Sequence, residues 1–153
     1  MGGKIKRRPV EPDPTYNSVI VGQIINYVLR KGKKALARNI VYNSFEIINQ
    51  KTSRPAIDVF EEAVKNARPM LEVKPRRVGG AVYQIPREVP EKRGVALALR
   101  WIVEASKKKK GKPMHEKLAI EIMACANKEG EAIRKRDAVH KMADANKAFA
   151  HLG

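Results

Sequence analysis

The sequence predicts a mainly α-helical single domain of about six helices, with a β-hairpin that protrudes between the third and fourth helices. Apolar residues recur at helical spacing in six segments, whereas one stretch around Gly79-Gly80 alternates with period two. The chain has 153 residues and is 43% hydrophobic, which is enough to bury a real core in one domain spanning residues 1–153.

The first part of the chain is predicted to be an extended arm followed by a helix. Residues 1–16 are basic and then rich in proline, so we expect an extended basic arm. Either Asn17 or Ser18 caps the first helix, because both side chains can accept a hydrogen bond from a free backbone N–H. This helix is expected to continue to about Arg30.

Two more helices precede the hairpin. The second is expected from about Lys33 to about Lys51, with an apolar residue at every third or fourth position. Pro55 suits the first turn of the third helix, and Pro69 restricts the residue before it, so that the helix stops there.

The β-hairpin is predicted over residues 71–88. Gly79-Gly80 supplies the positive φ angles of a tight turn. This turn would pair Val78 with Ala81, Arg77 with Val82, Arg76 with Tyr83, and Lys74 with Ile85. Neither face of such a ribbon is apolar enough to fold under helices, and an isolated two-stranded ribbon is marginal in water. The pattern therefore favours a basic hairpin that is stabilised by binding to an anionic polymer.

Three helices are expected after the hairpin. The fourth runs from Pro90 or Glu91 into the lysines at 107–110, the fifth from Pro113 or Met114 to about Asn127, and the sixth over residues 131–151. On a helical wheel the fourth helix carries a cationic stripe of Arg93, Arg100 and Lys107. The sixth carries Arg136, His140, Lys147 and His151 opposite an apolar stripe of Ala138, Met142, Ala145, Phe149 and Leu152.

The charge balance points to an anionic partner. Lys and Arg number 32 against 16 Asp and Glu, a net charge of +16. Such a charge favours binding to nucleic acid, although an ordinary solvated helix surface, an architectural DNA-binding protein and adhesion to acidic membranes remain alternatives. Tyr83 either packs on a neighbour or stacks on a base, and Trp101 is expected in the core.

Enzymatic and metal-binding motifs fail when their spacing is checked. Neither Gly32-Lys33 nor Gly111-Lys112 has the remaining residues of a P-loop, and His115-Glu116 lacks the second histidine of a zinc protease helix. Cys125 lies among apolar residues and is expected to be a buried thiol. We therefore expect no enzyme, no cofactor and no metal. Without a long apolar run or a signal peptide, we also expect a cytoplasmic protein that does not bind membranes.

Three segments resemble signatures of the small-subunit ribosomal protein seven family in its bacterial form. They are Gly32-Lys33-Lys34 with residues 37–42, then residues 96–105, and then residues 135–151. The order of elements, with a Gly-Gly hairpin between the third and fourth helices, is also similar, and the resemblance covers nearly the whole chain.

The resemblance implies a structural protein of the small ribosomal subunit. Members of this family bind the 3′ major domain of the small-subunit ribosomal RNA directly and help to start assembly of the head. They lie near the exit site for tRNA and the mRNA path, and they contact ribosomal protein eleven. No small-molecule substrate is implied. The resemblance assigns rRNA binding to Lys4, Lys6, Arg7, Arg8, Lys33, Lys34, Arg38, Lys74, Arg76, Arg77, Tyr83, Arg93, Arg100, Lys107, Lys108, Lys109, Lys110, Lys112, Arg134, Lys135 and Arg136.

Overall fold

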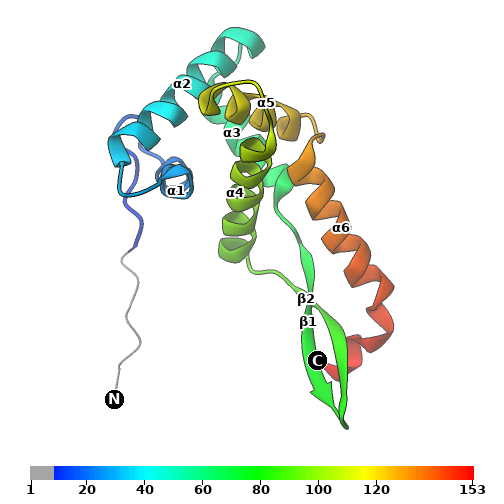
Figure 1. Cartoon of the computed structure of the whole chain (residues 1–153). Coiled ribbons are helices and arrows are strands. Elements are labelled where there is room, and N and C mark those ends of the chain that lie inside the picture. Colours follow the sequence, from blue (N-terminus) through cyan, green and yellow to red (C-terminus); the bar gives the residue numbers. More distant parts are fainter. Residues whose placement is uncertain (1–8) are drawn as a thin grey trace, which may run out of the picture.

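The computed structural model describes residues 9–153, and the predicted mainly helical fold with one hairpin is confirmed (Figure 1). The helices are α1 (Val19–Val28), α2 (Lys34–Thr52), α3 (Ala56–Ala67), α4 (Glu91–Lys108), α5 (Met114–Ala126) and α6 (Glu131–Ala145), followed by a short 3₁₀ helix, η1 (Lys147–Leu152). The strands β1 (Leu71–Val78) and β2 (Ala81–Glu88) form the hairpin between α3 and α4. In residues 9–153, no helix is both long enough and apolar enough to span a membrane.

The core lies among α1 to α5. Phe45 of α2 and Phe60 of α3 are fully buried, with their ring centroids 5.3 Å apart. Leu118 of α5 is also fully buried, and Trp101 of α4 is only 7% exposed, which confirms its predicted role in packing. Burial of these apolar side chains is the main force that holds the helices together.

Local signals set the start of α1. The Ser18 side chain accepts a hydrogen bond from the backbone N–H of Val21 at 3.3 Å, so Ser18 rather than Asn17 caps this helix. Asn17 instead has a positive φ of 48°, which turns the chain into the cap.

Of the predicted extended arm, residues 1–8 lie outside the described part of the chain, and residues 9–16 lie against α1 and α2. Asp13 is 3% exposed, accepts hydrogen bonds from the backbone N–H groups of Thr15 and Tyr16, and accepts a third from the Tyr42 hydroxyl of α2. The segment also lies close against α1, since a Cβ at Gly22 would be 2.6 Å from the backbone oxygen of Glu11. The buried Asp13 carboxylate holds this segment in place, and the proline-rich sequence gives no sign of its partner Tyr42.

The predicted hairpin register is confirmed at all four pairs. Val78 pairs with Ala81, Arg77 with Val82, Arg76 with Tyr83, and Lys74 with Ile85. Gly79 and Gly80 have φ values of 57° and 85°, which the turn requires.

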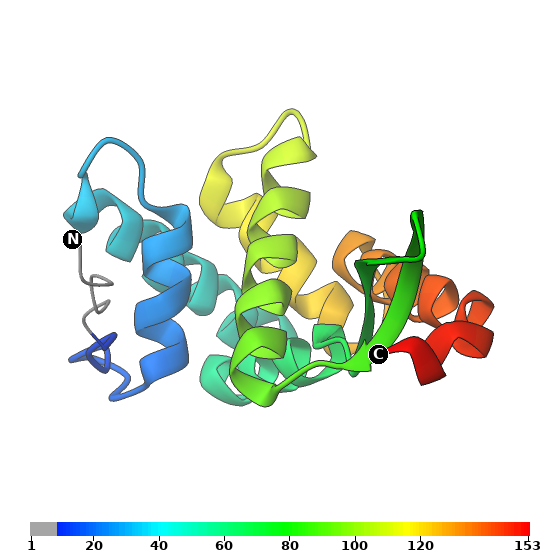
Figure 2. The same ribbon diagram turned by 90° about the horizontal axis from the view of Figure 1, so that it is seen from below.

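The expectation that the ribbon has no apolar support is wrong. Ile85 is only 5% exposed, and the Tyr83 ring packs on Phe149 of η1 at a centroid distance of 5.2 Å. Figure 2 shows the hairpin with α4 on one side and with α6 and η1 on the other. The C-terminal segment therefore supplies the hydrophobic contact that the hairpin sequence lacks.

The predicted sixth helix, residues 131–151, is wrong in its length and in its orientation. The α-helix ends at Ala145, where the Asn146 side chain donates to the backbone oxygen of Met142, and the chain continues as η1. Met142 of the predicted apolar stripe is 53% exposed, whereas Ile133 is 4% exposed. The inner side of α6 instead carries polar groups, Arg136 and His140, that bond to the last turn of α3 and to the loop after it.

Candidate nucleic-acid interface

Some of the hairpin side chains predicted to bind RNA already have partners inside the protein, and others have none. Lys74 and Arg77 are exposed and, within the described part of the chain, have no ion-pair partner. Arg76 is exposed too, but its guanidinium donates to the backbone oxygen of Leu152 at 2.6 Å. Tyr83 packs on Phe149, so its ring is engaged in the fold. Lys74 and Arg77 are therefore the hairpin side chains that are available to an RNA.

The base of the hairpin is held by a carboxylate between two arginines. Glu72 accepts hydrogen bonds from both Arg87 and Arg93 at 2.8–3.0 Å. The hydrogen bonds from Arg93 are the main cause that lowers the pKa of Glu72, and Arg87 adds to it against the opposing effect of burial. Arg93, predicted to bind rRNA, thus has a structural partner already, while Arg100 on the same helix is exposed.

Lys109 differs from the neighbouring lysines because it pairs with a buried carboxylate. Its ammonium lies 3.1 Å from Oε2 of Glu121, a residue of α5 that is fully buried. Oε2 has no partner with hydrogen-bond geometry, so the contact is an ion pair, whereas Oε1 accepts from the N–H of Ala132. Lys109 therefore compensates a buried charge, while Lys108, Lys110 and Lys112 are exposed to solvent.

Cys125 is also part of this buried cluster. Its Sγ lies 3.7 Å from Oε1 of Glu121, and burial together with this carboxylate raises the pKa of the thiol to about 12. The predicted buried thiol is confirmed. At such a pKa, very little reactive thiolate is present at neutral pH.

The cations of α6 mostly have partners inside the protein. Arg136 donates to the backbone oxygen of Asn66, and the imidazole of His140 accepts from the N–H of Met70 at 2.9 Å. Burial, and secondly the charge of Arg136, lowers the pKa of His140. Lys135 pairs with Glu104 at 3.2 Å. Two residues of the predicted cationic stripe of α6, Arg136 and His140, therefore face the protein and not the solvent, contrary to the prediction.

Arg134 likewise pairs with Glu131 one turn earlier on the surface of α6. Both side chains are largely exposed, and such a surface pair contributes little to stability. Its guanidinium can therefore exchange this partner for a phosphate at low cost.

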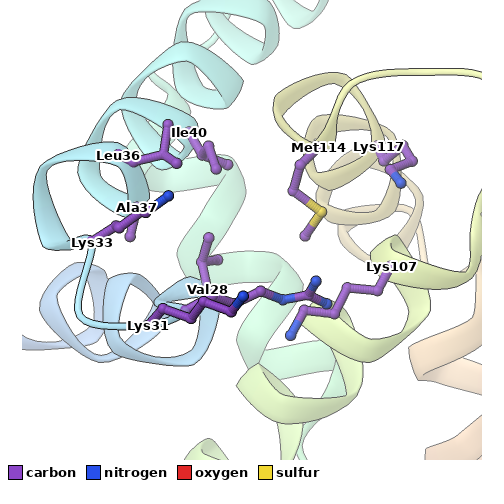
Figure 3. Close-up of a pocket in the computed structure, with 10 residues that line it drawn as sticks. Val28, Lys31, Lys33, Leu36, Ala37, Ile40, Lys107, Met114 and Lys117 are labelled. Carbon is purple, nitrogen blue, oxygen red and sulfur yellow. The ribbon is translucent and has the colours of Figure 1, made fainter.

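The junction between α1 and α2 forms a cationic pocket with a volume of about 500 Å³ (Figure 3). It brings the predicted residues Lys33 and Lys107 together with three cations that were not among the predicted site residues, namely Arg30, Lys31 and Lys117. The run Arg30-Lys31-Gly32-Lys33-Lys34 carries a signal that would have found the first two.

Lys34 and Arg38 line a second cavity, of about 480 Å³, between α1, α2 and the segment at 9–14. Both thus face the N-terminal segment instead of the cationic pocket. The four remaining predicted cations, Lys4, Lys6, Arg7 and Arg8, lie outside the described residues. Within residues 9–153, no group of three or more His, Cys, Asp or Glu side chains could hold a metal ion.

The sequence is similar to that of a known protein family over nearly the whole chain. The model of the family described as Ribosomal protein S7p/S5e matches residues 2–147. The chain is 56% identical to a protein named small ribosomal subunit protein uS7 from Dictyoglomus thermophilum, over 97% of this chain and 96% of the relative. It is 53% and 54% identical to proteins of the same name from Thermotoga maritima and a Synechocystis strain, with the same coverage of both chains.

Proposed function

This chain belongs to the S7p/S5e family of ribosomal proteins, and on that premise we propose that it binds the 3′ major domain of small-subunit ribosomal RNA directly. In this role it is a structural, non-enzymatic constituent of the small ribosomal subunit. By binding this RNA domain early, it helps to start assembly of the head.

The observation that carries the proposal is a set of exposed cations that the fold itself does not use. Lys74 and Arg77 lie on the hairpin, Arg100 on α4, and Lys33 at the junction that opens α2. Figure 2 shows α4 between α1 on one side and the hairpin on the other, and one extended RNA can reach cations on all three elements. An excess of positive charge without internal partners is what binding to phosphates requires.

The mechanism that fits these residues is recognition of RNA shape. Lysine and arginine neutralise phosphates over a folded junction, and the hairpin fixes how the protein is oriented on it. With about eight phosphate contacts, the logarithm of the affinity should fall against the logarithm of salt concentration with a slope of roughly −6 to −7.

The proposal includes the surroundings expected for this family. The protein would lie near the tRNA exit site and the mRNA path, would contact ribosomal protein eleven, and would act on cytoplasmic ribosomes. Family membership supports this part of the proposal.

A filter-binding titration at fixed physiological salt tests the central claim. It compares the isolated 3′ major domain with an unrelated structured RNA of equal length and with duplex DNA. A preference of a hundredfold or more for the ribosomal domain is expected, while equal binding to all three would leave only a nonspecific polycation.

A charge reversal with a matched control locates the surface. Arg77→Glu on the hairpin is expected to weaken binding about tenfold, and Lys51→Glu at the far end of α2 is expected to leave it within twofold. Both side chains are exposed, so both variants should keep the fold, and Lys51→Glu should lower the melting temperature slightly because it places a negative charge in the last turn of α2. Equal losses from both variants would mean that only net charge matters.

A further inference from the structure

The cationic pocket at the α1–α2 junction has an apolar interior. Val28 from α1, Leu36 and Ile40 from α2, and Met114 from α5 line it, and Figure 3 shows their side chains on different sides of one space. Leu36 is 54% exposed, so its apolar side chain is available for contact with a ligand. The pocket volume of about 500 Å³ falls within the roughly 300–1,000 Å³ typical of small-ligand sites.

Positive charge surrounds this apolar interior. Five of the lining residues are cationic, namely Arg30, Lys31, Lys33, Lys107 and Lys117, and the lining contains no acidic residue. Lys117 is held in place, because its ammonium donates to the backbone oxygen of Lys109 at 3.1 Å. Burial, and secondly repulsion from Arg30, lowers the pKa of Lys107, so an anion in the pocket would relieve an existing cost.

The backbone of the junction adds to the site. Lys31 and Gly32 have consecutive positive φ angles of 52° and 72°, and the lysine value is uncommon for a residue with a side chain. The α2 helix that follows begins at Lys34 without a side-chain cap: the N–H of Lys34 donates to the backbone oxygen of Gly32, and the next N–H groups have no side-chain acceptor. Both features suit an anionic group near the start of α2.

We propose that this pocket holds one unstacked nucleotide of the bound RNA, with its base against the apolar interior and its phosphates against the surrounding cations. The inference rests on the proposed function and adds the kind of RNA feature that the site selects. A phosphate alone would not use the apolar interior. An apolar protein side chain would not neutralise the five cations. A nucleotide satisfies both, and the Arg30 guanidinium supplies a plane on which a base can stack.

Leu36 is the position for the decisive substitution, since it is exposed and a change there should not disturb the core. Leu36→Glu places a negative charge in the pocket and is expected to weaken binding to the 3′ major domain at least tenfold. Met142→Glu is the matched control: it adds the same charge at an apolar helix position that is 53% exposed and distant from the pocket. This control should bind within twofold of the unchanged protein.

Photocrosslinking identifies the occupant. With p-benzoylphenylalanine in place of Leu36 in the full chain, the crosslink to the 3′ major domain should map to one nucleotide in a loop, bulge or junction. Crosslinks confined to paired stems, or no crosslink at all, would overturn the inference. In assembled small subunits, a crosslink to another protein in place of RNA would overturn it as well and assign the pocket to a protein side chain.

The two proposals fail in distinguishable ways. If the unchanged protein prefers the 3′ major domain while Leu36→Glu and Met142→Glu behave alike, the pocket inference is wrong and the proposed function stands. If the unchanged protein shows no preference among RNAs, the proposed function fails and the inference fails with it.

Discussion

The carboxylate of Glu72 lies 3.0 Å from two nitrogens of the Arg93 guanidinium, and this contact joins the first strand of the hairpin to the first turn of α4. Arg87 from the opposite strand shares the same carboxylate. Glu72 is only 11% exposed at its side chain, so the three groups form a partly buried cluster at the base of the hairpin. This one acid therefore links both strands of the hairpin to α4.

The Glu72 cluster predicts a pH dependence of stability. Its arginine partners lower the pKa of Glu72 in the folded protein below the usual 4.5. The carboxylate thus stabilises the fold above that usual value, and this contribution is lost as the pH falls through the lowered pKa. Urea unfolding should show Glu72→Gln to be less stable than the unchanged protein by about 1 kcal/mol at pH 7. The difference should shrink below pH 4.5, and a difference that is constant with pH would contradict the role of the charge.

Arg93 and Arg100 should respond differently to the same substitution. Arg93→Gln removes a partner of Glu72 and is expected to cost about 1 kcal/mol of unfolding free energy. Arg100→Gln, at an exposed position, should leave stability unchanged and weaken RNA binding severalfold. Thermal unfolding and filter binding of both variants test this, and the reverse pattern would show that the Glu72 contact is dispensable.

Lys109 is expected to matter for folding, unlike the lysine beside it. Lys109→Ala leaves the fully buried Glu121 without its cation, and we expect a loss of about 2 kcal/mol after allowance for the 29% exposure of the lysine. Lys110→Ala, at an exposed neighbouring position, serves as the control and should change stability by less than about 0.5 kcal/mol. Equal effects in urea unfolding would mean that the Lys109–Glu121 pair contributes nothing.

The hydrogen bond between Tyr42 and Asp13 should be measurable by removing one hydroxyl. The two oxygens are 2.6 Å apart, and Tyr42→Phe leaves the buried carboxylate without this donor at a cost of about 1 kcal/mol. Tyr27→Phe is the control, because the Tyr27 hydroxyl makes no hydrogen bond within residues 9–153. Chemical denaturation of both variants should separate them, and a Tyr42→Phe protein as stable as the control would contradict the anchoring of this segment.

The sequence was sufficient to predict the hairpin register because that register depends on local information. Gly79 and Gly80 determine where the turn lies, and alternation then determines every pair on either side. The helix starts follow similar local signals, as with Ser18 before α1. Features that require only neighbours in the chain were therefore predicted well.

The errors arise where a partner comes from a distant segment. The polar inner side of α6 is explained by acceptors and donors near residues 66–70, about 70 positions away from Arg136 and His140. The pairing of Lys109 depends on a carboxylate one helix later. The cationic pocket combines residues from α1, α2, α4 and α5. A helical wheel describes one helix at a time, so it cannot predict these contacts, which depend on how the helices pack.

The support of the hairpin by η1 has a consequence for the order of events during synthesis. Arg76 precedes its partner Leu152 by 76 positions, and Tyr83 precedes Phe149 on the same side of the ribbon. A ribosome that makes this chain therefore produces both strands well before the segment that covers them. During that interval Tyr83 and Ile85 lack their final contacts, and an isolated strand pair is only marginally stable. The hairpin accordingly cannot complete its packing until the C-terminal segment has been made, even though it lies in the middle of the chain.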